Sequence, residues 1–307
     1  MCTACTYTYR DARGNRIVQT LGDLIHAAMA TGLLAPSPPA WMRLGLPNID
    51  AAMGGAGIQP GTVGILGGGT GSCKSTLAMH MALNSTDQWG VVSLEDNAAQ
   101  LGLRAVAMAA GIDSRRLLRG TAACLDEIDP ALRALWEREF PLFECPLDAT
   151  QEEALVCARR LAQAGCRVII LDYLTKIRSD PGADRRSDIQ RLWAGLQRCA
   201  VDEQVAIIAV TQLNRSSQRG EPSLQSPSES SSIEIEARFA LMAWVSPDAM
   251  RADTQVISVK LAKNIWGGVG ATDRFVRAGA NLVHEDDCGY RLSPEEVQDD
   301  RSQARRA

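Results

Sequence analysis

The sequence predicts an α/β domain with a mostly parallel sheet and helices on both faces. Short apolar runs alternate along the chain with longer segments whose apolar residues recur at helical spacing. A glycine-rich turn joins the first of these runs to the first helical segment of the domain, and a later run ends in an aspartate. Strands that alternate with helices favour a parallel sheet whose two faces are covered by those helices.

The N-terminal segment contains one predicted helix, residues 21–34, with apolar residues at helical spacing. A proline-rich stretch beginning at Pro36 then ends it. A helix this short cannot bury its apolar face alone, so it packs either on its own domain or on a neighbouring subunit. Both alternatives stay open, and residues 1–43 are expected to form an N-terminal arm and linker helix.

The core is expected to span residues 44–290. The predicted strands are residues 62–66, 90–94, 168–171 and 205–210, and the predicted helices are residues 74–83, 98–111, 151–164 and 188–202. After Ile233, short strands at residues 239–245, 255–261 and 272–276 are expected to extend the sheet. The charged tail, residues 291–307, is expected to be disordered.

Two segments rich in polar residues, Gly and Pro, residues 178–186 and 214–229, are predicted to be loops. Long loops at strand ends are usually functional or mobile, and a solvated surface loop is the alternative for each.

Composition narrows the class of protein. The net charge of −4 over 307 residues argues against a surface coated in basic charge, but leaves a local basic loop lining a channel open. Nine cysteines without regular spacing are typical of reduced intracellular thiols, and only Cys2 and Cys5 form a CxxC pair. No secretory signal is visible, and no stretch reaches the roughly 20 apolar residues of a membrane span. We therefore expect a cytoplasmic protein with no membrane partner.

Residues 67–76 (GGGTGSCKST) lie between a predicted strand and a predicted helix, which is the context of a phosphate-binding P-loop. Backbone N–H groups of the turn and the helix N-terminus would cradle the β- and γ-phosphates of ATP. Lys74 would reach the terminal phosphates, and the Ser75 hydroxyl would ligate Mg²⁺. The expected cofactor-binding residues of the loop are Gly68, Gly69, Thr70, Gly71, Ser72, Cys73, Lys74, Ser75 and Thr76.

Cys73 stands where the GxxxxGK[ST] pattern has its second glycine. A side chain there is expected to crowd the loop or strain its backbone. A thiol beside a lysine at a helix N-terminus is also expected to have a lowered pKa. The alternatives are a glycine-rich turn without nucleotide and a dinucleotide-binding GxGxxG motif. The second leaves the Lys-Ser pair unexplained, and no glycine follows three residues after Gly69.

The apolar run at residues 168–172 (VIILD) predicts a buried strand that delivers the carboxylate of Asp172 at its C-terminal end. Such an aspartate commonly holds the Mg²⁺ shell in P-loop proteins. The pattern is weak alone and stronger downstream of a P-loop. Ser75 and Asp172 are therefore the expected metal site.

Five further blocks share their order and spacing with one family of ATPases. They are residues 46–50 (LPNID) with 59–61 (QPG), 91–120 (beginning VVSLE), 171–174 (LDYL), 211–215 (TQLNR) and 229–234 (ESSSIE). Together they resemble the motor domain of hexameric replicative DNA helicases of the DnaB type, over residues 44–283. The resemblance implies a RecA-like P-loop NTPase core that hydrolyses ATP at the subunit interfaces of a hexameric ring. It also implies translocation on single-stranded DNA during replication, with other replication proteins as partners. The family's primase-interacting N-terminal domain is expected to be absent, and residues 21–34 resemble at most its linker helix.

The resemblance assigns roles to single residues. By position, Glu95 would activate the attacking water, and Gln212 would sense the γ-phosphate, so that both act with Lys74 in catalysis. Lys263 matches a lysine that reaches into the neighbouring subunit's nucleotide. The candidate DNA contacts, which would bind backbone phosphate without sequence preference, are Arg185, Arg186, Arg215, Arg219, Glu229 and Ser231.

Three positions depart from the family's pattern. Ser228 and Ser231 replace an arginine and a glycine of the DNA loop, and Ile265 occupies the place of the arginine finger. An arginine finger supplies transition-state charge, so its replacement puts turnover in question. A degenerate ATPase with a structural or regulatory role therefore stays open as an alternative, as does a RecA/RadA-like recombination ATPase.

Overall fold

The computed structural model describes residues 25, 41–54, 57–119, 122–179, 184–212, 236–245, 255–278 and 280–287. The chain divides into two units, Met1–Trp41 and Met42–Ala307, and the second contains the sheet and the helices described below. The predicted arm and linker helix, residues 1–43, lie outside the described residues apart from Ile25 and residues 41–43, and the predicted tail at residues 291–307 lies outside them entirely.

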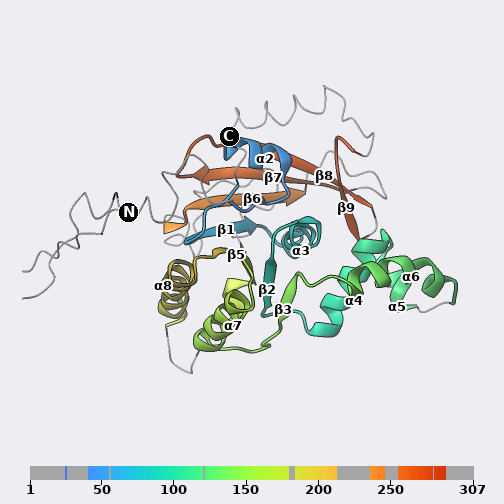
Figure 1. Cartoon of the computed structure of the whole chain (residues 1–307), viewed down its shortest axis with the longest axis horizontal. Coiled ribbons are helices and arrows are strands. Elements are labelled where there is room, and N and C mark those ends of the chain that lie inside the picture. Colours follow the sequence, from blue (N-terminus) through green and yellow to red (C-terminus); the bar gives the residue numbers. More distant parts are fainter. Residues whose placement is uncertain are drawn as a thin grey trace, which may run out of the picture. The chain divides into compact units, whose positions relative to one another are not determined.

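One sheet organises the second unit (Figure 1). Its nine strands, counted over the described residues, follow the order β3-β2-β4-β5-β1-β6-β7-β8-β9. Neighbours from β3 to β6 pair in parallel, and neighbours from β6 to β9 pair antiparallel. The strands are β1 (Thr62–Gly68), β2 (Trp89–Ser93), β3 (Leu142–Glu144), β4 (Val168–Asp172), β5 (Ala206–Gln212), β6 (Phe239–Val245), β7 (Gln255–Asn264), β8 (Thr272–Ala278) and β9 (Asn281–His284).

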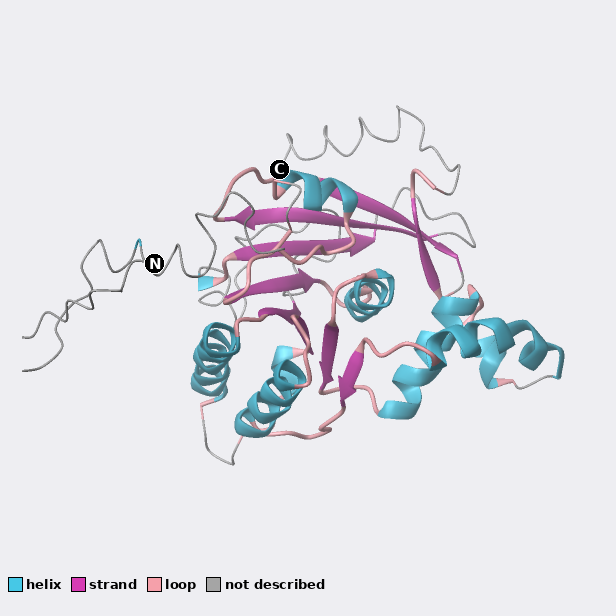
Figure 2. Ribbon diagram, in the orientation of Figure 1, coloured by secondary structure: helices cyan, strands magenta, loops and turns pink. Residues whose placement is uncertain are grey.

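Helices cover both faces of the sheet (Figure 2). Four do so: α2 (Pro47–Ala52) and α3 (Lys74–Asn84) on one face, and α7 (Gln151–Gln163) and α8 (Arg185–Glu203) on the other. The other described helices are α4 (Ala98–Ala110), α5 (Ser114–Leu118), α6 (Ala122–Trp136) and the 3₁₀ turn η1 (Leu174–Lys176), and α5 and α6 pack against α4. In the part of the chain that is described, none of the helices combines the length and the hydropathy needed to cross a membrane.

The central strands are buried on both faces because their side chains alternate between two cores. In β4, Ile169 and Leu171 pack in the core that α7 and α8 cover. Val168 and Ile170 of the same strand pack in the core that α2 and α3 cover. The predicted mostly parallel sheet with helices on both faces, extended by antiparallel strands, is thereby confirmed.

Two local predictions differ from the structure. The loop predicted to run to Arg186 ends earlier, since α8 begins at Arg185. The Asp184 side chain starts this helix by accepting hydrogen bonds from the N–H groups of Arg186 and Ser187, at 3.2 and 3.3 Å. The stretch between α4 and α7, where no element was predicted, contains α5, α6 and β3.

Candidate nucleotide-binding site

The phosphate-binding loop connects the end of β1 to the start of α3, as the sequence predicts. Gly68 has no room for a side chain, since a Cβ there would lie 2.4 Å from Ser72 Oγ and 2.5 Å from the Ala243 carbonyl oxygen. Gly71 and Cys73 have left-handed backbone conformations, with φ of 79° and 60°. The glycine conformation is therefore retained at Cys73, where a side chain makes it costly.

Lys74 folds back onto the loop that precedes it. Its Nζ donates hydrogen bonds to the carbonyl oxygens of Gly68 at 3.0 Å and Gly69 at 2.8 Å. Burial lowers the pKa of Lys74, while the negative charges of Asp172 and Glu95 oppose that shift. The ammonium group thus lies beneath the anion cradle formed by the loop and the start of α3.

Asp172 lies at the C-terminal end of β4 and is only 6 % exposed. Burial raises its pKa to about 6, while a hydrogen bond with the Ser75 hydroxyl opposes the rise. Its Oδ1 atom has no hydrogen-bond partner among the described residues. Mg²⁺ prefers hard oxygen ligands, and the unpaired carboxylate oxygen of Asp172 and the neighbouring Ser75 hydroxyl are ligands of this kind. Ser75 and Asp172 therefore fit the metal that the sequence predicts.

Side chains from three strands meet at one cavity of about 290 Å³. Its lining residues are Thr70, Gly71, Cys73, Lys74, Ser75, Thr76, Glu95, Tyr173 and Gln212. Glu95 follows β2 and pairs with Lys176 Nζ at 3.6 Å. Gln212 ends β5, and its Nε2 donates to Thr70 Oγ1 of the loop at 2.7 Å. The cavity lies where the carboxyl ends of parallel strands meet, which is where α/β sheets bind ligands.

The predicted pKa of Cys73 is wrong in direction. Burial raises the pKa of this thiol, and the positive charges of Arg277 and Lys74 only oppose the rise. The prediction weighed the neighbouring lysine and the helix N-terminus but not desolvation, which disfavours the thiolate.

Sequence reasoning also missed three side chains around the cavity. Tyr173 lines it, and Lys176 forms the ion pair with Glu95. Both residues follow closely in sequence after Asp172, the last residue of β4, and this position was the signal that could have identified them. Arg277 Nη1 lies 4.0 Å from Cys73 Sγ, and no sequence signal links two residues so far apart in the chain.

The structure does not bring Lys263 to this chain's own phosphate loop. Lys263 in β7 pairs with Ala240 of β6, which in turn pairs with Ile65, the middle residue of β1. Gly68, where the loop begins, lies three residues further along that strand, and Lys263 is not among the residues that line the cavity. Ile265 follows β7 and is 47 % exposed. A role of Lys263 in a neighbouring subunit's site stays a prediction.

Two of the six candidate DNA contacts are described. Arg185 and Arg186 are exposed in the first turn of α8, and the Arg185 guanidinium donates to the Thr175 carbonyl oxygen. The remaining candidates lie outside the described residues: Arg215, Arg219, Glu229 and Ser231.

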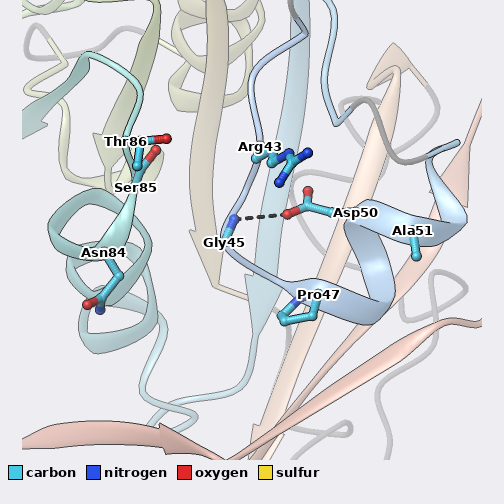
Figure 3. A pocket seen from close by; sticks show the side chains of 8 residues that line it. All are labelled: Arg43, Gly45, Pro47, Asp50, Ala51, Asn84, Ser85 and Thr86. Atoms are coloured by element: carbon cyan, nitrogen blue, oxygen red, sulfur yellow. Dashed lines mark hydrogen bonds between the residues drawn. The ribbon is translucent and has the colours of Figure 1, made fainter.

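A second, larger cavity of about 500 Å³ lies beside α2 and the C-terminal end of α3 (Figure 3). Asp50 points toward the chain segment that precedes α2, and accepts hydrogen bonds from the N–H groups of Leu44, Gly45 and Leu46 at 2.9, 3.1 and 3.3 Å. These bonds fix the approach of the chain to α2. None of the predicted phosphate or metal residues lines this cavity.

The sheet, the phosphate loop and the buried strand-end carboxylate together define a P-loop NTPase with a RecA-like core. Residues 42–277 match the family described as DnaB-like helicase C terminal domain, and the chain belongs to that family.

The chain is similar to the replicative DNA helicase DnaB of Rickettsia bellii (strain RML369-C), with 28 % identity over 221 residues, covering 65 % of this chain and 44 % of the relative. It is also similar to the replicative DNA helicase DnaB of Haemophilus influenzae (strain ATCC 51907 / DSM 11121 / KW20 / Rd), with 30 % identity over 204 residues, covering 62 % and 43 %. The chain therefore spans less than half the length of these two relatives.

Solved structures show the same fold. A DnaB-like replicative helicase, whose structure concerns its interactions with primase, superposes with a TM-score of 0.72 at 17 % identity, covering 87 % of this chain and 67 % of that chain. The RadB recombinase superposes with a TM-score of 0.52 at 16 % identity, covering 78 % and 98 %.

Proposed function

We propose that the protein is an ATP-driven DNA helicase motor of the DnaB type, which hydrolyses ATP at the subunit interfaces of a hexameric ring in the cytoplasm and translocates on single-stranded DNA during replication. The observation that carries the proposal is the convergence on one cavity of Lys74 from the start of α3, Glu95 from beyond β2 and Gln212 from the end of β5, beside buried Asp172. The chain's membership of the helicase family supports the same conclusion.

Each side chain has a task that follows from its position. Lys74 and the N–H groups at the start of α3 bind the β- and γ-phosphates. Ser75 and Asp172 would hold Mg²⁺, which would supply positive charge next to the phosphates. Glu95 lines the same cavity, where its carboxylate polarises the attacking water. The bond from Gln212 to Thr70 ties the loop to the chain segment that follows β5, so it couples nucleotide state to that segment.

The ring is proposed because the family's site takes a lysine from the neighbouring subunit. Lys263 matches that lysine and does not line this chain's own nucleotide cavity, which supports a role at a neighbour's site. DNA is proposed to contact Arg185 and Arg186, which are exposed at the start of α8, together with the predicted loop at residues 214–229. Other replication proteins are candidate partners, since the relatives that the chain resembles are replicative helicases.

A degenerate, partner-dependent ATPase is the second candidate. The left-handed Cys73 in the loop and the aliphatic Ile265 in the place of the arginine finger favour it. Both changes would slow hydrolysis without preventing nucleotide binding.

The two candidates differ in turnover. ATP hydrolysis would be measured with and without single-stranded DNA, at a concentration where light scattering shows the oligomer, with Lys74→Ala as the control. Hydrolysis that rises with DNA and disappears in Lys74→Ala is expected. Hydrolysis no greater than that of Lys74→Ala, in a protein that still assembles and binds ATP, would favour the degenerate candidate instead.

A further inference from the structure

Strand β8 lies between β7 and β9 in the antiparallel part of the sheet. Its alternate side chains, on the face that α2 and α3 cover, contact those helices or the residue before α3 one after another. Asp273 accepts hydrogen bonds from N–H groups at the N-terminus of α2. The Phe275 ring packs edge-on against His80 of α3, with centroids 5.1 Å apart. Arg277 then reaches Cys73, the residue directly before α3, so the last of these side chains lies at the phosphate loop.

The Arg277 guanidinium is held next to the cavity wall. Its Nη1 lies 3.0 Å from Gln255 Oε1 of β7 and 4.0 Å from Cys73 Sγ, and the side chain is half-buried. Cys73 itself lines the nucleotide cavity. A guanidinium stays charged at every physiological pH, so it adds a fixed positive charge at this side of the loop.

The order of strands gives the direction in which a nucleotide lies. Glu95, Asp172 and Gln212 follow or end β2, β4 and β5, which all lie on one side of β1 in the sheet. Arg277 in β8 lies on the other side of β1. If the γ-phosphate lies at Glu95 and Gln212, the α-phosphate and the nucleoside extend from the loop toward β6–β8.

We propose that Arg277 is a nucleotide-binding residue of this chain, which contacts the α-phosphate and nucleoside end of the ATP bound by its own phosphate loop. Guanidinium groups bind phosphate through paired N–H donors and stack on aromatic bases, so one side chain suits both parts of this end. The inference rests on the proposed nucleotide site. Arg277 is distinct from an arginine finger, which acts on the γ-phosphate from a neighbouring subunit.

Inorganic pyrophosphate separates the two ends of the ligand, because it offers the loop two phosphates, in place of β and γ, and neither an α-phosphate nor a nucleoside. Binding of ATP, ADP and pyrophosphate, each with Mg²⁺, would be measured by calorimetry. Arg277→Gln is expected to weaken ATP and ADP binding about 10-fold, which equals about 1.4 kcal/mol, and to change pyrophosphate binding less than about twofold. The matched control is Arg274→Gln, which removes the same charge from the same strand where Arg274 pairs with Glu285, and it is expected to leave all three affinities unchanged.

Two further variants keep the test decisive. Arg277→Lys preserves the charge but not the planar fork, and is expected to lose part of the affinity even if Arg277→Gln folds poorly. In a Cys73→Gly background, Arg277→Gln is expected to retain its effect, because the contact with nucleotide is direct. Loss of the effect in that background would show that Arg277 acts only through Cys73, and would overturn the proposal.

The remaining outcomes are also informative. Equal weakening of ATP and pyrophosphate would place the contact at the terminal phosphates and overturn the proposal, as would unchanged ATP binding. A wild-type protein that binds none of the three ligands better than Lys74→Ala would instead overturn the nucleotide site itself.

Discussion

Buried carboxylates in two regions of this chain have opposite surroundings. Around α2, Asp50 accepts three backbone N–H groups, and Asp273 accepts the N–H groups of Asn48 and Ile49, both at 3.0 Å, and contacts His284 Nε2 at 3.0 Å. At the phosphate loop, Asp172 is just as buried, yet its Oδ1 has no partner among the described residues.

The hydrogen bonding of these buried aspartates distinguishes a structural carboxylate, Asp50, from a carboxylate suited to bind a ligand, Asp172. Burial raises the pKa of both Asp50 and Asp172, but three backbone N–H groups oppose the rise at Asp50, and the hydrogen bond of Asp172 with Ser75 leaves its pKa at about 6. A carboxylate whose oxygens are saturated with donors fixes the backbone. A buried carboxylate that has one oxygen without a hydrogen-bond donor can use that oxygen to bind a ligand, which here is Mg²⁺.

The largest expected effect comes from Asp172→Asn. It removes the proposed metal ligand, so ATP hydrolysis is expected to fall about 1,000-fold, the scale of losing a positioned electrostatic group. Steady-state hydrolysis at saturating Mg²⁺ measures this. The exposed Asp286→Asn is the matched control, and a loss of less than about 10-fold in Asp172→Asn would show that the metal is held elsewhere.

The same substitution is expected to stabilise the protein in Mg²⁺-free buffer. Because burial raises the folded-state pKa of Asp172 from 3.8 to about 6, ionisation costs stability above pH 6, and this cost fades as the pH falls from 6 toward 4. At pH 7.5 the free energy of unfolding is expected to rise by about 3 kcal/mol in Asp172→Asn, with no gain at pH 4. Urea unfolding at both pH values tests the sign; a loss of stability at pH 7.5 contradicts it.

Ile265, in the turn that follows β7, allows a test of whether the region around α2 contributes to a neighbouring subunit's nucleotide site. The turn after β7 lies beside α2, since a Cβ at Gly268 would lie 4.0 Å from the Ala52 carbonyl oxygen. If the ring places Ile265 at a neighbour's nucleotide, Ile265→Arg supplies the missing charge and is expected to raise turnover about 100-fold, part of the full worth of an arginine finger. Ile265→Gln, equally polar and uncharged, is the control. Equal rates for both variants would remove Ile265 from the interface.

Removal of a saturated carboxylate is expected to affect stability alone. Asp273→Ala leaves two N–H groups of α2 and His284 without their acceptor, and is expected to lower the free energy of unfolding by about 3 kcal/mol. Asp286→Ala removes an exposed carboxylate, 3.5 Å from the same histidine, and is expected to cost less than about 0.5 kcal/mol. Nucleotide affinity should be unchanged in both, and a selective loss of affinity in Asp273→Ala would break the distinction between the two regions.

The phosphate site could be predicted from the sequence, whereas the contacts around α2 could not. Residues of the phosphate site come directly after apolar runs, at Gly68, Asp172 and Gln212, and parallel strands necessarily bring such ends together. The contacts around α2 and Arg277 were not predictable, because they join residues far apart in the chain. Asn48 and Asp273 are separated by 225 positions, and Cys73 and Arg277 by 204. Periodicity gives the face on which a side chain lies, but not which helix lies across from it.

Cys73 combines a local and a long-range feature, because its backbone retains the glycine conformation while its side chain reaches toward β8. Relief of the left-handed strain favours Cys73→Gly by about 1–2 kcal/mol, and the greater entropy of glycine in the unfolded chain opposes it by roughly 0.4–1 kcal/mol. The net expectation is a gain of about 0.5–1 kcal/mol in the free energy of unfolding, the smallest of the expected effects.

Gly71→Ala provides the reverse experiment in the same loop. Gly71 has a φ of 79°, and a Cβ added there would meet no atom within 4 Å, so alanine introduces strain without a clash and is expected to cost about 1 kcal/mol. Chemical denaturation of both variants measures the two signs. If Cys73→Gly loses stability while Gly71→Ala behaves as expected, the contacts of the Cys73 thiol outweigh its backbone strain. The thiol would then be a structural link between the phosphate loop and β8, rather than a tolerated replacement of glycine.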